Sequence, residues 1–314
     1  MEKRPAEAGP TTALTLAAAE AIVEIVPDVG GAIASFRWRG HDVLRPTPTD
    51  ARVVRDVRRH ACYPLVPYSN RIANATLRHG GRDHALARNF GDSPHAIHGV
   101  GWQRAWTTVA AASTSAQIAL DHDASGDDAS AWPWPFRATQ TFTLRADDRG
   151  ATLSARLAIE NTGAVAFPFG LGWHPFFPKP LGTTLAFDAA SVWLNDATQL
   201  PVERVAVPAD WHYATARPLG EVVLDHVFEP STGTATIAWP DAGVALTIVA
   251  DSALDRRIVY VPAGRDFLAF EPATHMTDAF NRAARGQPDT GTRRLPPGAA
   301  FSCTMRLNAT EPQR

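Results

Sequence analysis

Apolar and polar side chains alternate with a period of two along much of this chain. In residues 151–161, four apolar side chains fall on one face: Leu153, Ala155, Leu157 and Ile159. Residues 140–144 and 301–307 repeat the pattern. Successive side chains leave opposite faces of a β-strand, whereas a helix repeats about every 3.6 residues. These segments are therefore predicted to be strands that bury one face.

Further short apolar runs are separated by turn-favouring residues, since the chain has 22 glycines and 25 prolines. The runs cover residues 21–26, 32–38, 117–120, 235–239, 244–250, 258–261 and 267–270. Residues 121–130 have the polar composition of a solvated hairpin connection. Many short strands without a long helical period favour an antiparallel sandwich or barrel. In the absence of a linker or a fixed repeat, residues 1–314 are predicted to form one all-β domain with its core over about 20–308.

The composition excludes several classes of partner. The 30 basic and 32 acidic residues give a net charge of −2, so no electrostatic argument supports a nucleic acid or an anionic membrane. Two cysteines, Cys62 and Cys303, are too few for a disulfide framework or a thiolate metal cage. Residues 1–7 carry acidic side chains and a proline where a secretory signal is basic and then apolar. The chain is therefore expected to be a soluble cytoplasmic protein.

Polar and titratable residues stand within unusually apolar stretches at several places. They are Asn70 with Arg71, His98, His174, Glu271 and, less distinctly, Asp225. Taken singly, each fits a structural role. A Glu at a strand end is usually solvated, and a His beside a Pro is usually a hydrogen-bonded structural residue. Arg71 alone fits a surface ion pair, and Asp225 alone fits a turn cap.

Taken together, these residue types fit acid–base chemistry on a neutral polyol. A His in aromatic surroundings and a Glu after a buried strand form a natural proton donor and acceptor, because burial and neighbours shift their pKa values. Arg, Asn, Asp and a second His supply hydrogen bonds for hydroxyl groups. Trp102, Trp173 and Trp193 are expected to offer flat apolar faces to a sugar ring. The residues alone do not select a reaction.

A metal site is the alternative reading of the histidines. His95 and His98 stand three residues apart, but they lack the Glu-containing helix of a zinc protease. On a loop or a strand, two rings at this spacing need not converge. The His-x-His motif of a cupin-type metal barrel is absent from the sequence. No metal and no cofactor are therefore predicted.

Five motifs resemble, in order, those of the aldose 1-epimerase (galactose mutarotase) family. They are Asn70-Arg71, His98-Gly99, residues 172–177 (GWHPFF), Asp225-His226 and Phe270-Glu271-Pro272. They are similar to the family's early substrate-binding, His-Gly, Gly-x-His-Pro-Tyr/Phe-Phe, Asp-His/Pro and terminal Glu motifs. Order and rough spacing match over residues 20–308, which is nearly the whole chain.

The resemblance implies a large twisted β-sandwich, or supersandwich, and cofactor-free interconversion of the α and β anomers of a free aldose. It implies that His174 is the general acid, that Glu271 is the general base, and that the substrate is bound by Asn70, Arg71, His98 and Asp225. Many galactose mutarotases carry a Gln on the strand before the catalytic Glu, where this chain has Ile258. The chain is also closer to a shorter bacterial subgroup whose natural sugars are poorly defined.

This scheme predicts a particular protonation state. The Glu271 carboxylate removes the anomeric hydroxyl proton while the His174 imidazolium protonates the ring oxygen, and the ring opens to the aldehyde. Mutual attraction of the two charges is expected to lower the carboxyl pKa and raise the imidazole pKa. The pH profile is then bell-shaped, with the base on its acidic limb and the acid on its alkaline limb.

Two other functions stay open at this point. A hexose-6-phosphate epimerase of the same fold needs an arginine cluster at the cleft rim, for which the sequence offers Arg58, Arg59, Arg78, Arg82 and Arg88. A non-catalytic carbohydrate-binding protein does not need both His174 and Glu271. In each case the expected partner is a small-molecule sugar, and the protein is expected to be a monomer or a homodimer.

Overall fold

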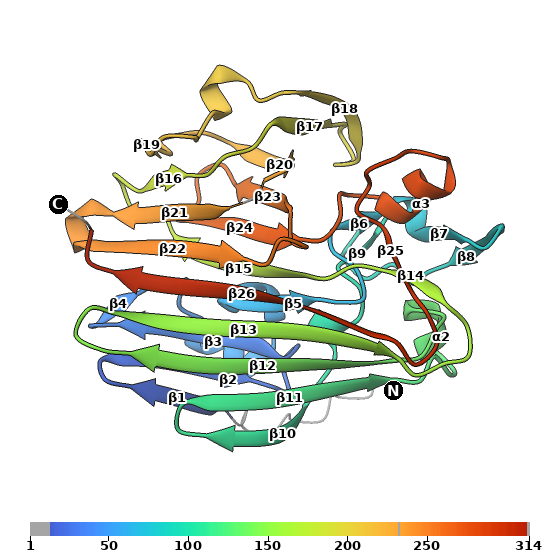
Figure 1. Ribbon diagram of the computed structural model, residues 1–314, viewed down its shortest axis with the longest axis horizontal. Helices are drawn as coiled ribbons and strands as arrows, with labels where there is room; N and C mark the ends of the chain where they lie inside the picture. The colour runs from blue at the N-terminus through green and yellow to red at the C-terminus, as the bar shows by residue number, and fades with distance from the viewer. Residues whose placement is uncertain (1–12, 232, 313–314) are drawn as a thin grey trace, which may run out of the picture.

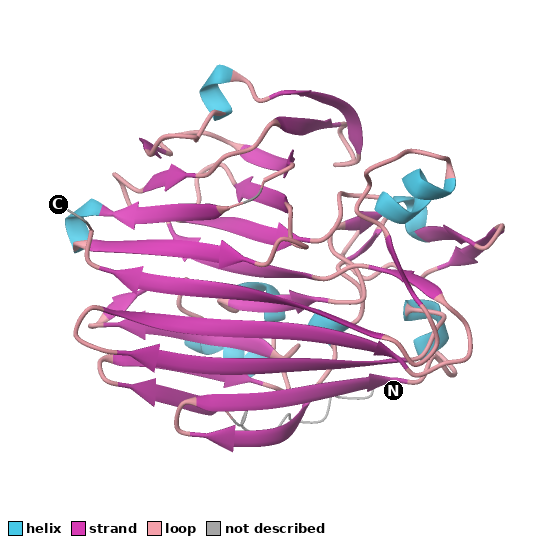
Figure 2. Ribbon diagram, viewed as in Figure 1, coloured by secondary structure: helices cyan, strands magenta, loops and turns pink. Residues whose placement is uncertain are grey.

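The alternating segments form two large antiparallel sheets, one lying behind the other in the view of Figure 1. The computed structural model describes residues 13–231 and 233–312, so the expectation for residues 1–7 lies outside the described part. Strands dominate the fold and helices are few and short (Figure 2). The predicted all-β sandwich is confirmed.

The larger sheet has eleven strands in the described residues. Its order is β1 (Leu14–Ala18), β2 (Ala21–Val26), β3 (Ala32–Trp38), β5 (Cys62–Leu65), β15 (Gly172–Pro178), β24 (Phe267–Ala273), β23 (Arg256–Val261), β20 (Leu224–Glu229), β17 (Ser191–Asn195) and β18 (Pro201–Ala206), with β4 (His41–Asp42) paired to β3. Strands distant in the sequence, such as β5, β15 and β24, are thus neighbours in the sheet.

The smaller sheet has nine strands over the same described ranges. Its order is β10 (Thr107–Ala112), β11 (Ser115–His122), β12 (Phe136–Ala146), β13 (Gly150–Asn161), β26 (Ala300–Thr310), β22 (Val244–Ala250), β21 (Thr234–Trp239), β16 (Thr184–Ala186) and β19 (Arg217–Pro218). Short two-stranded pairs are β6 (Arg71–Ile72) with β9 (Ala96–Ile97), β7 (Thr76–His79) with β8 (Arg82–Ala85), and β14 (Phe167–Phe169) with β25 (Arg293–Leu295).

The helices are single turns or little more. They are α1 (Thr49–Val54), α2 (Asp128–Ala131) and α3 (Ala279–Ala284), with 3-10 turns η1 (Val57–Arg59), η2 (Ala73–Ala75), η3 (Gly101–Gln103), η4 (Ala209–Trp211) and η5 (Pro240–Ala242). None of the helices in the described residues is long and apolar enough to cross a membrane. The connection between the antiparallel strands β11 and β12 covers residues 123–135. The predicted hairpin stretch 121–130 therefore overlaps the end of β11 and includes the beginning of α2.

The alternation places the core between the two sheets. Strands β13 and β26 pair with Leu153 opposite Leu307 and Leu157 opposite Cys303, and all four side chains are buried. From the larger sheet, Trp173 packs on Phe142 of the smaller one with ring centroids 6.2 Å apart. Because neighbours along a strand point to opposite faces, the residues next to Trp173 on β15 point away from this core.

Three loops at one end of the sheets are locked together around His275. Its Nδ1–H donates to the carbonyl oxygen of Met276 (2.7 Å), and its Nε2 accepts from the N–H of Ser69 (3.0 Å). The ring lies so close to Gly170 that a Cβ there would be 1.8 Å from Cδ2 of His275. Any larger residue than glycine at position 170 would displace the ring. These contacts fix the loop that leads into Asn70.

Candidate active site

A row of side chains crosses four adjacent strands of the larger sheet, on the face turned away from the core. Tyr63 of β5 lies opposite His174 of β15, and the register of β15 with β24 puts His174 opposite Glu271. Ile258 of β23 lies opposite Glu271 on its other side. Directly opposed residues of antiparallel strands share one face. The sheet register alone therefore brings the predicted acid and base together.

The His174 and Glu271 side chains are in direct contact. Nε2 of His174 lies 3.2 Å from Oε1 of Glu271, and the two residues are 7% and 2% exposed. Phe176 stacks on the His174 ring with centroids 4.4 Å apart, and Tyr63 lies against it at 4.7 Å. The pair lines a cavity of about 280 Å³. That volume lies near the lower end of the range for small-molecule sites, about 300–1,000 Å³.

Asn70 and His98 hold each other in the wall of this cavity. The N–H of Asn70 donates to Nδ1 of His98 (3.0 Å), and the N–H of His98 donates to the carbonyl oxygen of Asn70 (2.9 Å). Both residues have left-handed backbone, with φ of 57° and 60°. Gly99 follows with φ of 71°, and a Cβ there would lie 2.4 Å from the carbonyl oxygen of Val66. The His-Gly pair therefore needs its glycine for close packing against the strand that precedes Asn70.

The side chains of Asn70 and Asp225 fix the orientation of Arg71. Oδ1 of Asn70 accepts from the N–H of Arg71 (2.8 Å) and from its Nη1 (3.2 Å), and Nη2 of Arg71 lies 3.8 Å from Oδ2 of Asp225. The structure thus brings together every site residue predicted from the sequence. The cavity is lined by Asn70, Arg71, His98, His174, Asp225 and Glu271.

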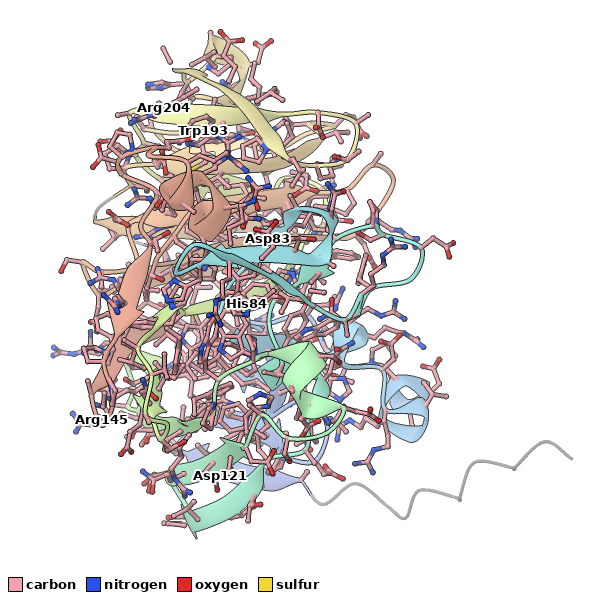
Figure 3. The ribbon with its side chains drawn as sticks, turned by 90° about the vertical axis from the view of Figure 1, so that its right-hand side faces the viewer. Asp83, His84, Asp121, Arg145, Trp193 and Arg204 are labelled. Atoms are coloured by element: carbon pink, nitrogen blue, oxygen red, sulfur yellow. The ribbon has the colours of Figure 1, made fainter. Side chains whose placement is uncertain are left out.

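The aromatic residues that line the cavity are not the three tryptophans predicted from the sequence. Trp102, Trp173 and Trp193 are 2%, 0% and 8% exposed, and none of them lines the cavity. Trp193 lies beside Arg204 toward an edge of the larger sheet (Figure 3), and its Nε1–H donates to Oε1 of Glu229 (2.6 Å). The apolar surface of the cavity comes instead from Tyr63, Phe90, Ile97, Phe176, Ile258, Tyr260 and Phe267. Phe176 could have been predicted to line the cavity, because it stands two residues after His174 on the same strand and so shares its face.

The arginines that line the cavity are also not the group of five that the sequence offered for a cluster at the cleft rim. Of those five, Arg58 lines the cavity, whereas Arg59 pairs with Asp50 and Arg78 pairs with Asp83 outside it. Arg45, which no motif indicated, lines the cavity as well.

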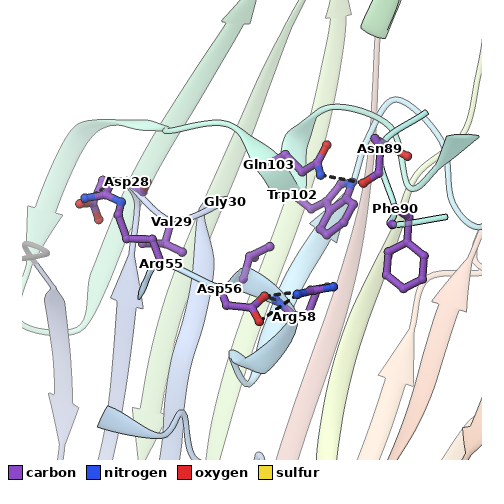
Figure 4. A pocket seen from close by; sticks show the side chains of 12 residues that line it. Asp28, Val29, Gly30, Arg55, Asp56, Arg58, Asn89, Phe90, Trp102 and Gln103 are labelled. Carbon is purple, nitrogen blue, oxygen red and sulfur yellow. Dashed lines mark hydrogen bonds and ion pairs between the residues drawn. The ribbon is translucent and has the colours of Figure 1, made fainter. Parts of the chain in front are cut away.

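A second hollow of about 410 Å³ adjoins the first and shares Arg58 and Phe90 with it (Figure 4). Its charged side chains face one another. Arg55 lies 2.9 Å from Oδ2 of Asp28, and Nε of Arg58 lies 2.9 Å from Oδ1 of Asp56. The two hollows therefore meet at the Arg58 end of the candidate active site.

Burial reverses the protonation state expected from the sequence. Burial, together with the charges of Arg45 and Arg71, lowers the pKa of His174 to about 3. Burial also raises the pKa of Glu271 well above its usual value, and the nearby Asp225 carboxylate adds to this. Mutual attraction was expected to do the opposite, but both charged forms lose their hydration in this site. Both shifts favour the uncharged forms, a neutral imidazole beside a protonated carboxyl, so that the pair shares one acidic proton.

This buried carboxyl has a consequence for stability. Above pH 4.5, Glu271 of the unfolded chain releases its proton while the folded protein retains it. The wild type should then lose about 1.4 kcal/mol of unfolding free energy per pH unit until the raised folded pKa is reached. Glu271→Gln removes this titration, so the melting temperature of the variant should rise relative to that of the wild type as the pH increases above 4.5. Parallel melting-temperature curves for the two proteins across that range would contradict the buried, protonated carboxyl.

Histidine and glutamate side chains in one cavity could also bind a metal ion. His98, His174 and Glu271 each offer one ligand atom, and these atoms lie within 4.8 Å of one another. However, Nδ1 of His98 accepts a hydrogen bond from a backbone N–H, so its proton must be on Nε2. Nε2 therefore has no lone pair for a metal, and Nδ1 is already occupied by the backbone N–H. His95, the other member of the sequence pair, is held by the N–H of Asn74 (2.9 Å) outside the cavity.

Chelation should therefore leave the protein unchanged. Exhaustive dialysis against a chelator is expected to alter neither the melting temperature nor the rate of the reaction proposed below. Both can be measured before and after dialysis, by calorimetry and polarimetry. A loss of activity that zinc or manganese restores in proportion would favour the metal reading instead.

Comparison with known proteins identifies the family of this chain. The aldose 1-epimerase family model matches residues 12–308. The chain belongs to the aldose 1-epimerase family. It is 29% identical over 295 residues to the uncharacterized protein YphB of Escherichia coli K12, covering 90% of this chain and 93% of that one. A crystal structure from Escherichia coli K12 is similar with a TM-score of 0.85 and 27% identity, covering 96% and 100% of the two chains.

A galactose mutarotase-like protein from Clostridium acetobutylicum shares the fold, with a TM-score of 0.83, 17% identity and 96% coverage of both chains. The predicted supersandwich of this family is therefore confirmed. The position of Ile258 opposite Glu271 also shows that the strand before the glutamate carries an apolar side chain into the cavity.

Proposed function

We propose that this protein is a cofactor-independent aldose 1-epimerase, which interconverts the α and β anomers of a free aldose. The observation that carries the proposal is the contact of 3.2 Å between His174 and Glu271 at the wall of a cavity of about 280 Å³. A buried acid and base in contact suit a substrate that gives up one proton and receives another at neighbouring oxygens. A cyclic hemiacetal is such a substrate, with O1 and O5 on the same carbon.

The reaction needs one proton to move in each direction. Transfer of the shared proton from Glu271 to His174 converts the resting pair into a carboxylate base and an imidazolium acid. Glu271 then takes the proton from O1 while His174 gives its proton to O5, and the C1–O5 bond breaks to leave the open-chain aldehyde. Rotation about C1–C2 presents the other carbonyl face. Closure reverses both transfers, so the protein ends with the proton with which it began.

The remaining polar groups suit the hydroxyls of a sugar. His98 lines the cavity and carries its proton on Nε2, and Arg71 is fixed by Asn70 while facing Asp225. A donor, a cation and a carboxylate in one wall can satisfy hydroxyl groups that both donate and accept. Tyr63 and Phe176 flank the His174 ring and reduce the access of water to it.

Polarimetry tests the proposal. Freshly dissolved single anomers of several aldoses are followed with and without protein. The expected result is a first-order approach to the equilibrium rotation whose rate constant rises in proportion to protein concentration for at least one sugar. Sugar binding by calorimetry without any acceleration would show a carbohydrate-binding protein in place of an enzyme.

A further inference from the structure

Arg45 is held rigidly at one end of the cavity. Its guanidinium carbon lies 3.9 Å from the ring centroid of Phe176 and 4.5 Å from that of Phe267. Its Nη2 donates to the carbonyl oxygens of Arg58 (2.9 Å) and His60 (3.0 Å). Two aromatic rings and two carbonyls thus fix the plane of the guanidinium while other parts of it still line the cavity.

Arg45 lacks the carboxylate partner that the arginines around it have. Arg55, Arg58 and Arg71 each face a carboxylate, which belongs to Asp28, Asp56 and Asp225 respectively. Arg45 takes part in none of the ion pairs formed by residues 13–231 and 233–312. Burial lowers its pKa to about 10, so it is still a cation at neutral pH. Arg45 is half-buried, and the carboxylates of Asp266 and Asp56 act on its charge from beyond ion-pair distance. An anionic ligand in the cavity can therefore supply the direct ion pair that Arg45 lacks.

The position of Arg45 identifies the part of the substrate that it faces. Phe176, on which Arg45 stacks, also stacks on His174. In the proposed reaction His174 protonates O5, and O5 is bonded to C5, which carries C6. The C6 group therefore lies on the His174 and Phe176 side of the ring. Asp225 lies on β20, on the side of β24 away from β15, and its carboxylate faces Arg71.

There is room for a larger group at this end. Arg58 and Phe90 line both the catalytic cavity and the adjoining hollow of about 410 Å³ (Figure 4). The backbone carbonyl of Arg58 also anchors Arg45. A substituent longer than a hydroxymethyl group can thus extend past Arg45 toward this hollow.

We propose that Arg45 makes the protein selective for aldoses that carry an anionic group at C6, either a carboxylate or a phosphate. The inference rests on the proposed epimerase function and names the substrate class of that same site. A guanidinium whose plane is fixed in advance can form charge-assisted hydrogen bonds to such a group at little cost in side-chain entropy. The flanking Phe176 and Phe267 rings exclude water and strengthen the attraction.

The first test compares three substrates with the wild-type protein: D-glucose, D-glucuronate and D-glucose 6-phosphate. We expect kcat/KM for at least one of the two anions to exceed that for glucose by about tenfold to a hundredfold, as one charged hydrogen-bond contact allows. The anion with the larger value distinguishes carboxylate from phosphate. We expect added salt to reduce the preference, because it screens the pairing.

The second test changes the cation. Arg45→Met keeps an unbranched apolar stem between the two rings and should bring the anion-to-glucose ratio of kcat/KM close to one. Arg59→Gln is the matched control, since Arg59 lines neither hollow, and it should keep the wild-type ratio.

An unchanged ratio in folded Arg45→Met overturns the inference. If that variant does not fold, the wild-type ratio decides, and a value of one or less overturns the inference while the epimerase proposal stands. Failure to accelerate any aldose contradicts the proposed function itself.

Discussion

Replacing Glu271 by Gln is expected to lower kcat/KM for anomer interconversion by about 10²–10⁴-fold, the usual contribution of one general acid–base group. The amide has nearly the same shape and can still accept and donate hydrogen bonds, but it cannot exchange a proton with the anomeric hydroxyl or with His174. Polarimetry with one aldose, over a range of concentrations, separates this loss from a change in binding.

Two controls accompany this variant. Its melting temperature should be at least that of the wild type at neutral pH, because the buried carboxyl is a source of instability. Glu203→Gln, which changes an exposed carboxylate of β18 in the same sheet, should keep the wild-type rate. A folded Glu271→Gln protein with wild-type kcat/KM would mean that Glu271 is not the base.

His174→Asn is expected to cause a loss of similar size, about 10²–10⁴-fold, because Asn cannot carry a proton to the ring oxygen. The pH profile gives a second readout that a merely structural role for His174 would not change. In the wild type the active form is the pair with one proton. Activity should fall at low pH when a second proton enters, and at high pH when the shared proton leaves.

The pKa shifts set the direction in which these limbs move. The pKa of His174 is lowered to about 3 and that of Glu271 is raised, so the wild-type profile should be flat between these two pKa values. With Asn at position 174, Glu271 is the single titrating group of the pair and acts only as the carboxylate. Residual activity should then rise with pH through the raised Glu271 pKa and lose its alkaline limb. Retention of the wild-type alkaline limb would identify another acid, and His98 is the next candidate.

The strands were predictable because their signal is local. The alternation at Leu153, Leu157 and Ile159 marks a buried face that needs no knowledge of the partner strand. The neighbours of β15 were not predictable in this way. β5 and β24 lie far from it in the sequence, and their pairing depends on the whole sheet and not on any local pattern.

In the candidate site, too, the residues with a local sequence pattern were predictable and the long-range contacts were not. His174 and Glu271 were found from the residues around them, but their contact follows from the register of β15 with β24. The three tryptophans were wrongly expected at the ligand, because the largest apolar side chains gain most from complete burial. Arg45 had no local signal, since its importance comes from Phe176 and Phe267 on two distant strands.

The protonation state was also wrong from sequence alone. A list of residues gives the charges of His174 and Glu271 and predicts attraction between them, but it does not give their depth. At 7% and 2% exposure, the loss of hydration shifts both pKa values toward the uncharged forms, against the direction of that attraction.

The central claim is that this cavity opens and closes the sugar ring, and exchange NMR on an aldose already at anomeric equilibrium tests it most directly. With wild-type protein, cross-peaks should connect the H1 resonances of the α and β anomers. They should be absent for the methyl glycoside, which has no anomeric hydroxyl proton to give. Glu271→Gln at the same concentration should remove the cross-peaks from the aldose spectrum. Wild-type spectra without cross-peaks, for every sugar shown to bind in the cavity, would contradict the account.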